Sequence, residues 1–210
     1  MCIRDRHDKR DSIIKPTKGY IIKLGSEIAG LGGDEQFVKT TASGKVYKGI
    51  YGNNIIFSSE LEGGFLSMGK GYSKIVDRFQ LGGRSFRGFK YSGIGPRELS
   101  GGSYTIPLGG EKYAVARFAA SFPLGLPREL GLFGSVFAEA GTLWSLKTDP
   151  NIAGLSNNIA LTDRSLRTSI GFAMNWETPI GPLQFNWSRP QKHLDADSLE
   201  YFSLNLATRF

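Results

Sequence analysis

Few residues of this 210-residue chain are suited to catalysis or metal binding. Histidine occurs twice, as His7 and His193, and each lies in a charged, turn-like context with no second histidine or cysteine nearby. Metal ligation and a catalytic triad both need such neighbours, so the sequence predicts neither. The one cysteine, Cys2, cannot form an internal disulfide. We therefore expect no enzymatic activity, no metal and no cofactor.

An arginine in an aromatic, glycine-rich stretch is the strongest candidate for a functional side chain. The stretch RSFRGFKYSGIGPREL, residues 84–99, sets Arg87 between Phe86 and Gly88, where neither a strand period nor a helix period is visible. Glycine at position 88 permits a tight backbone, and the rings of Phe86 and Phe89 would pack around the guanidinium. The stretch marks Arg87 as the candidate cation for a contact with a carboxylate.

The candidate carboxylate is Glu139, in VFAEAGTLW, which shares one face of a predicted strand with Phe137 and Gly141. In one interpretation Glu139 is a carboxylate solvated by water inside a barrel. In the other it forms a bidentate pair with Arg87. Composition alone does not choose between the two.

Strands with period-two alternation must position these side chains. The last segment, EYFSLNLATRF, alternates apolar with small or polar residues over its whole length. Its apolar face holds Phe202, Leu204, Leu206, Thr208 and Phe210. The two segments before it, 165–179 and 181–190, repeat the pattern and are joined by the short turn TPIGP. We expect one common face for Phe172, Trp176, Phe185, Trp187, Phe202 and Leu204.

Eight strands and one partial strand are predicted. The eight lie at residues 20–33, 35–50, 53–67, 112–123, 131–144, 165–179, 181–190 and 200–210, and the partial one at 11–19, broken by Pro16. Between the third and fourth strands lies a loop, residues 68–111, of about 44 residues, far above ordinary loop lengths. The loop contains Arg87.

Composition separates the possible fold classes. Glycine numbers 28 of 210 and aromatic residues reach 12%, which favours β-structure with many turns. No apolar run approaches the roughly 20 residues of a transmembrane helix.

The net charge of +7 is spread along the chain, so we expect no nucleic-acid partner. A soluble sandwich would carry more Lys and Glu on its second face, which here is small and polar like a barrel lumen. The sequence predicts an all-β, antiparallel transmembrane β-barrel.

An ordered set of motifs resembles one family. RDSIIKPTKGY, LGGRSFRGFKYSGIGPREL, FPLGLPRELGLFGSVFAEAGTLW and SIGFAMNWETPIGPLQFNWSRP occur in that order before a terminal aromatic residue. They resemble the C-terminal half of the barrel in the BamA family of outer-membrane protein assembly factors, most closely its alphaproteobacterial members. The resemblance implies eight to nine C-terminal strands of a 16-stranded barrel. No POTRA repeats are recognisable, so we expect a part of a longer protein.

The resemblance assigns roles to the candidate residues. In the family, a (V/I)RG(F/Y) motif on a long extracellular loop folds back into the lumen, where its arginine contacts an acidic strand motif. By position, the loop-to-barrel lock would comprise Arg87, Gly88, Phe89, Phe137, Glu139 and Gly141. Glu139 stands where aspartate is more usual, and Phe86 stands where a β-branched residue is usual.

The resemblance also implies a mechanism and partners. The last strand would form a lateral gate with Phe202, Leu204, Leu206 and Phe210, and it would offer an edge to unfolded outer-membrane protein clients. Accessory lipoproteins of the BAM complex and outer-membrane lipids are the other implied partners, in the outer membrane of a Gram-negative bacterium.

Two other functions and a domain division complete these expectations. A transporter of the two-partner secretion or TamA kind shares the arginine loop, and a small independent barrel could act as a pore. We expect residues 1–10 to be a non-native or disordered edge. Residues 11–210 would form the barrel part, with the loop 68–111 folded into the lumen.

Overall fold

A computed structural model describes residues 1–13, 15–30, 36–52, 54–100, 103–127, 130–147, 159–160, 164–178 and 181–206 of the chain. In these ranges the regular structure is β-sheet, and no helix is long and apolar enough to cross a membrane. The strands are β1 (Cys2–Asp8), β2 (Lys18–Ala29), β3 (Gln36–Ile50), β4 (Ile55–Lys70), β5 (Arg97–Ser100), β6 (Ser103–Pro107), β7 (Lys112–Pro123), β8 (Leu132–Trp144), β9 (Ile159–Ala160), β10 (Arg167–Thr178), β11 (Gly181–Lys192) and β12 (Phe202–Leu206).

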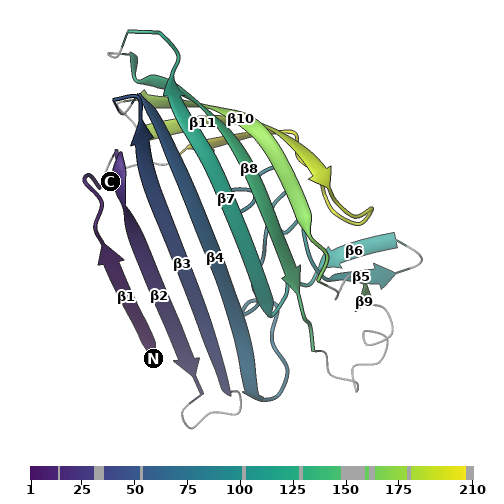
Figure 1. Ribbon diagram of the computed structural model, residues 1–210. Coiled ribbons are helices and arrows are strands. Elements are labelled where there is room, and N and C mark those ends of the chain that lie inside the picture. Colours follow the sequence, from purple (N-terminus) through teal and green to yellow (C-terminus); the bar gives the residue numbers. More distant parts are fainter. Residues whose placement is uncertain are drawn as a thin grey trace.

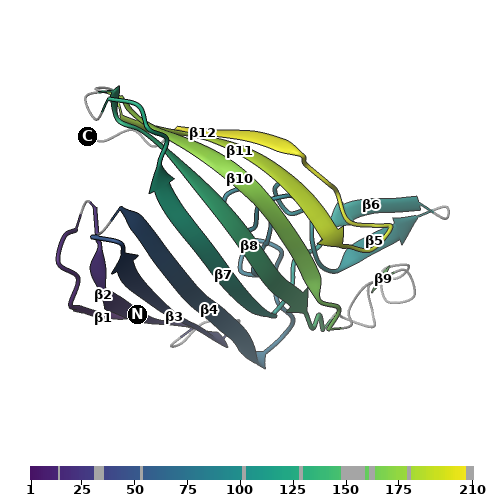
Figure 2. The ribbon, with the colours of Figure 1, turned by 45° about the horizontal axis from the view of Figure 1, so that its top comes forward.

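Nine of these strands form one antiparallel sheet, in the order β1-β2-β3-β4-β7-β8-β10-β11-β12. The sheet curves around the segment that joins β4 to β7, and this segment lies against one face of it (Figures 1 and 2). A second, three-stranded sheet has the order β6-β5-β9 and lies beside the long curved sheet (Figures 1 and 2). The all-antiparallel architecture and the eight full strands confirm the prediction from alternation.

Two expectations about the N-terminal end are wrong. The partial strand at 11–19 is instead mostly a turn, because the carboxylate of Asp11 accepts hydrogen bonds from the backbone N–H groups of Thr17 and Lys18. The Thr17 hydroxyl, with these N–H groups, lowers the pKa of Asp11 to about 2. The ninth strand is β1, whose residues Cys2–Asp8 all pair with β2, so this segment is not a disordered edge. That it is non-native stays a prediction.

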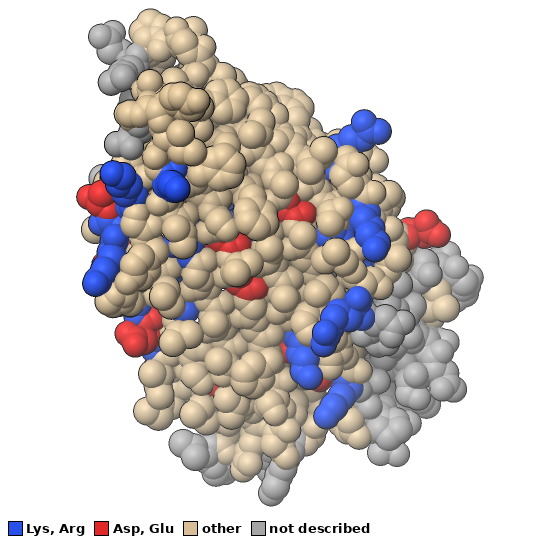
Figure 3. Space-filling view, in the orientation of Figure 1, with Lys and Arg blue, Asp and Glu red and all other residues tan. Residues whose placement is uncertain are grey.

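The two faces of the sheet differ as the alternation predicts. Ser169 and Asn186 are buried on the inner face, which we define as the face covered by the β4–β7 segment. Large apolar side chains are exposed on the outer face, among them Val46, Leu61, Phe118, Ile170, Trp176, Trp187, Phe202, Leu204 and Leu206. Phe172 and Phe185 join this face through ring contacts with Trp187. Figure 3 shows a face largely tan across its middle, with Lys and Arg gathered nearer its sides.

The hydrophobic core lies between the inner face and the long loop, which we now define as residues 71–111. The predicted loop began at 68, but β4 continues to Lys70. The core consists of Leu81, Phe86, Phe89 and Ile94 from the loop with Tyr113, Val115 and Leu143 from β7 and β8. The loop therefore occupies the place that a second large sheet would fill in a sandwich, and it is held there by apolar burial.

Candidate functional site

The carboxylate of Glu139 on β8 binds Arg87 at the centre of the long loop. Its Oε1 accepts a hydrogen bond from Arg87 Nε at 2.6 Å and lies 2.6 Å from Nη2. Its Oε2 accepts a hydrogen bond from the backbone N–H of Arg87 at 2.8 Å. The two side chains are only 13% and 2% exposed, so water screens the pair weakly. The structure thus brings together the two residues that the sequence singled out.

An aromatic ring lies against the paired guanidinium. The ring of Phe137, two residues before Glu139 on β8, has its centroid 3.5 Å from Arg87 Cζ. This is cation–π geometry in a buried setting. The sequence predicts this role for Phe86 and Phe89, and that prediction is wrong. They instead pack against each other, with ring centroids 5.4 Å apart, inside the apolar core. The two rings anchor the loop by burial, while Phe137 contacts the charge.

Two glycines allow the loop to approach the sheet. A Cβ on Gly141 would lie 2.7 Å from a ring carbon of the fully buried Phe86, so Phe86 packs on bare β8 backbone. Gly88 has φ of +92° and lies against Ser169. The Ser169 hydroxyl donates a hydrogen bond to the Arg87 carbonyl at 2.6 Å. The contact of Phe86 with Gly141 and the contact of Gly88 with Ser169 therefore both depend on a glycine, which has no side chain.

A second arginine, Arg117 on β7, binds the loop two residues before Arg87. Its Nη2 and Nε donate hydrogen bonds to the Ser85 carbonyl at 2.6 and 3.1 Å. Its Nη1 pairs with Glu62 Oε2 at 2.6 Å, and the Tyr113 hydroxyl donates to the other oxygen of Glu62 at 2.8 Å. Sequence reasoning missed this anchor. Alternation could have found it, because residue 117 falls on the same face as Tyr113.

The base of the loop is fixed by a buried carboxylate. Glu111 is 4% exposed and accepts hydrogen bonds from the Ser73 hydroxyl at 2.8 Å and from the Lys147 backbone N–H at 3.3 Å. Arg78 Nε donates to the Ser73 hydroxyl at 2.9 Å. Burial lowers the pKa of Arg78, and the Glu111 charge opposes this effect. The loop is thus tied to the sheet at its base as well as at its centre.

The predicted gate residues lie at one edge of the large sheet. β12 pairs with β11 from Trp187↔Phe202 to Leu183↔Leu206, and it is the last strand in the sheet order. Phe202, Leu204 and Leu206 are about half exposed, at 50%, 55% and 49%. Phe210 lies outside the described residues. Within the described chain, the second edge of β12 has no strand partner, so its backbone can pair with another strand.

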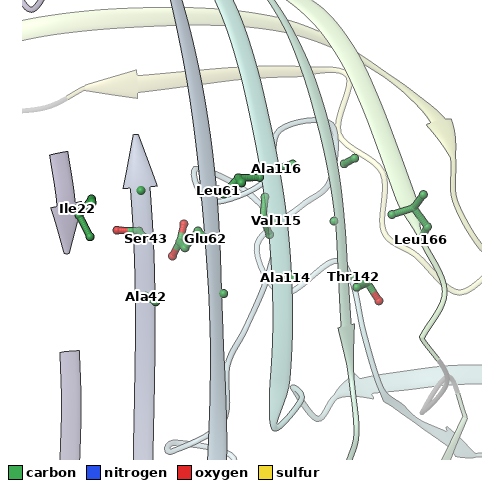
Figure 4. Close-up of a pocket in the computed structure, with 14 residues that line it drawn as sticks. Ile22, Ala42, Ser43, Leu61, Glu62, Ala114, Val115, Ala116, Thr142 and Leu166 are labelled. Carbon is green, nitrogen blue, oxygen red and sulfur yellow. The ribbon is translucent and has the colours of Figure 1, made fainter. Parts of the chain in front are cut away.

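Two hollows lie near the strands of the site. A polar cavity of about 240 Å³ beside the Arg87–Glu139 pair is lined by Lys45, Ser58, Glu60, Arg84, Arg117, Ala119, Gln184 and Asn205. A hollow of about 630 Å³ lies over β3, β4, β7 and β8, where side chains such as Ala42, Ala114 and Ala116 are small (Figure 4). Among the described residues no three His, Cys, Asp or Glu side chains are grouped to hold a metal.

The family model described as the Omp85 superfamily domain matches residues 6–210. The chain is similar to the outer membrane protein assembly factor BamA of Nitratidesulfovibrio vulgaris, with 29% identity over 90% of this chain and 22% of the relative. It is also similar to BamA of Neisseria meningitidis serogroup B, with 29% identity over 97% of this chain and 28% of the relative. The chain therefore spans about a quarter of the length of these relatives.

Two further similarities extend this result. The human sorting and assembly machinery component 50 homolog is 38% identical over 62% of this chain and 27% of its own length. Among solved structures, BamA from Haemophilus ducreyi lacking POTRA domains 1–3 superposes with a TM-score of 0.84 at 21% identity. The superposition covers 97% of this chain and 41% of that one, and it shows the shared strand arrangement.

Proposed function

This chain belongs to the Omp85 superfamily, and we propose that it is the C-terminal barrel part of an outer-membrane protein assembly factor. The whole protein would fold and insert β-barrel proteins in the outer membrane of a Gram-negative bacterium. Similarity to BamA proteins over most of the chain supports this proposal. The nine-stranded sheet, from β1 onwards, would form the barrel part, with the long loop inside the lumen.

The contact between Arg87 and Glu139 is the observation that carries the proposal. It joins residues 52 positions apart, one on the loop and one on β8. Around this contact, Gly88 and Gly141 allow close approach of the loop to the sheet, and the rings of Phe89 and Phe137 are buried. We assign these six residues as the loop-to-barrel lock. Its role would be to hold the loop inside the lumen and keep the barrel in an assembly-competent shape.

The edge of β12 would act on the client protein. An unpaired strand edge presents N–H and C=O groups that can add a further strand by β-augmentation. The client's terminal strand would pair there while its apolar side chains enter the lipid next to Leu204 and Leu206. Phe202 would stand at the start of this gate, and Phe210 would complete it. The outer-face side chains would contact lipid directly.

No covalent step is needed for this activity. Free energy would come from backbone hydrogen bonds formed by the client and from burial of its apolar face in lipid. Partners would be unfolded outer-membrane protein clients, accessory lipoproteins of the BAM complex and outer-membrane lipids. Catalytic side chains, a cofactor and nucleic acid have no part in the mechanism.

Client folding in vesicles tests the proposal. The protein, in the length that the cell makes, is reconstituted into liposomes and mixed with a urea-unfolded outer-membrane barrel. Folding is followed by protease resistance and by the shift of the folded barrel on unheated gels. We expect faster folding than in empty liposomes. Equal rates in both vesicle types would overturn the proposal.

A further inference from the structure

The connection between β11 and β12, residues 193–201, is paired to the long loop through backbone hydrogen bonds. Lys90 N–H donates to the Ser198 carbonyl at 2.8 Å, and Glu200 N–H donates to the Gly88 carbonyl at 3.0 Å. Phe89 and Leu199 form the antiparallel bridge between these two bonds. The loop therefore contacts the chain three residues before β12 begins. This contact starts one residue after Arg87.

A buried ion pair holds the same connection from the side of the sheet. Arg167 Nε lies 3.0 Å from Asp197 Oδ2, and Arg167 Nη2 donates to Asp197 Oδ1 at 3.2 Å. Both side chains are 0% exposed. Asp197 Oδ2 also accepts the Leu194 N–H at 2.8 Å, which closes the turn of the connection. A charged pair without access to water is stable only with such complete bonding.

The Arg167–Asp197 pair and the Arg87–Glu139 pair are neighbours on the inner face. Arg167 lies opposite Gly141 in the register of β10 and β8, and Ser169 lies opposite Glu139. Ser169 donates its hydroxyl hydrogen bond to the Arg87 carbonyl. Arg167, which anchors the connection, and Ser169, which anchors the loop, are therefore two residues apart on the same face of β10.

The loop contributes a second arginine to the connection. Arg97, on β5, is 6% exposed and donates from Nη2 to the Ser198 hydroxyl and to the Ser92 carbonyl, both at 3.2 Å. Residues 193–201 thus lie between two buried arginines, one on the sheet and one on the loop. The Tyr201 carbonyl, at the end of the connection, accepts the Ser188 N–H of β11. Tyr201 immediately precedes Phe202, the first residue of β12.

We propose that Arg167 and Asp197 are positioning residues that fix the 193–201 connection, so that the long loop and the gate strand β12 move together. This inference rests on the proposed function, because the gate is the part of the site that it deepens. The lock at Glu139 would then control the exposed edge of β12 at a distance. Release of the loop would free the connection, and release of the connection would loosen the loop.

Hydrogen exchange in the reconstituted protein, in the length that the cell makes, tests the coupling. In Asp197→Asn the buried Arg167 keeps its charge and loses its counter-charge. We expect the amides of Lys90, Ser198 and Glu200 to exchange about 100-fold faster, while amides of the β8–β10 ladder keep their protection. Unchanged exchange at Lys90 would overturn the proposal. Glu177→Gln, which breaks an exposed pair with Lys15, is the matched control and should change none of these rates.

A covalent rescue separates positioning from a general loss of stability. Phe89 and Leu199 form a non-hydrogen-bonded pair, whose Cα atoms are about 4.5 Å apart in such ladders, within reach of a disulfide. With both changed to cysteine and oxidised, Asp197→Asn should regain the slow exchange at Ser198 and Glu200 that the same oxidised pair shows with Asp197 intact, a reference that includes the loss of the buried Phe89 ring. Continued fast exchange at these amides would contradict the coupling. Because exchange is measured without a client, failure of the coupling and failure of client folding by the unmodified protein are separate results.

Discussion

Glu139 binds Arg87 through both of its oxygens, one to the guanidinium and the other to the backbone N–H. The carboxylate therefore recognises a position of the loop backbone as well as the identity of a side chain. An ion pair alone could follow a shift of the loop by rotation of the long arginine side chain. The additional backbone bond prevents this, because it fixes the Arg87 nitrogen 2.8 Å from β8's carboxylate.

This double contact predicts unequal effects of the two alanine variants. Arg87→Ala leaves the backbone hydrogen bond in place, but the buried Glu139 carboxylate loses its ion-pair partner. We expect a loss of about 3 kcal/mol in the free energy of unfolding. Glu139→Ala removes the bonds to both the guanidinium and the backbone and leaves the guanidinium against the Phe137 ring, so its loss should be at least as large. Urea unfolding in lipid vesicles measures both. A double-mutant cycle with no coupling between the positions would refute the pair's role.

A methyl group at Gly141 should separate the loop from the sheet. The added Cβ would lie 2.7 Å from Phe86, which is fully buried and cannot turn away. We expect Gly141→Ala to cost about 1–3 kcal/mol, the usual range for overpacking. Gly44→Ala is the matched control, because nothing lies within 4 Å of a Cβ there. Equal stability of the two variants in the same urea titration would show that Phe86 does not pack against Gly141.

Arg117→Lys should loosen the loop while preserving the charge next to Glu62. Lysine presents a single ammonium and cannot reproduce the fork that holds the Ser85 carbonyl from two nitrogens. We expect faster hydrogen exchange at residues 84–90 and little change in β2 and β3. Loop exchange identical to that of the unmodified protein would mean that the Ser85 contact does not hold the loop.

The strand alternation predicts opposite tolerance of charge at adjacent residues of β12. Leu204 is exposed on the outer face, whereas Asn205 lines the polar inner cavity. Leu204→Arg should destabilise the folded barrel in lipid by at most about 2–4 kcal/mol, the cost that arginine reaches at the bilayer midplane. Asn205→Arg should cost far less. The reverse order of stabilities in vesicle unfolding would invert the assignment of the faces.

Sequence reasoning found the features that repeat or stand out locally. Period-two alternation placed eight strands and both faces, and the glycine and aromatic residues around Arg87 marked the loop. It placed Glu139, Phe137 and Gly141 on one face because residues two apart in a strand share a face. These predictions needed only neighbours in the chain.

Features that depend on distant residues were missed or misplaced. β1 carries a charged sequence and becomes a strand only because β2 offers it an edge. Phe86 and Phe89 were expected at the guanidinium, but the apolar core between the loop and β7 binds them instead, because burial of two rings outweighs contact with one charge. Arg167 and Asp197 lie 30 positions apart in the sequence, each among mostly polar sequence neighbours, and no local pattern pairs them.

Site-specific cross-linking of a client is the most direct test of the central claim, that the edge of β12 receives the client's terminal strand. A photoreactive amino acid is placed at Leu204 on β12 or at Leu61 on β4, which are both exposed on the outer face. Illumination during client folding should link Leu204 to the client's last strand and leave Leu61 unlinked, because β4 is paired on both sides. Equal adducts at both positions, or none at Leu204, would contradict the account.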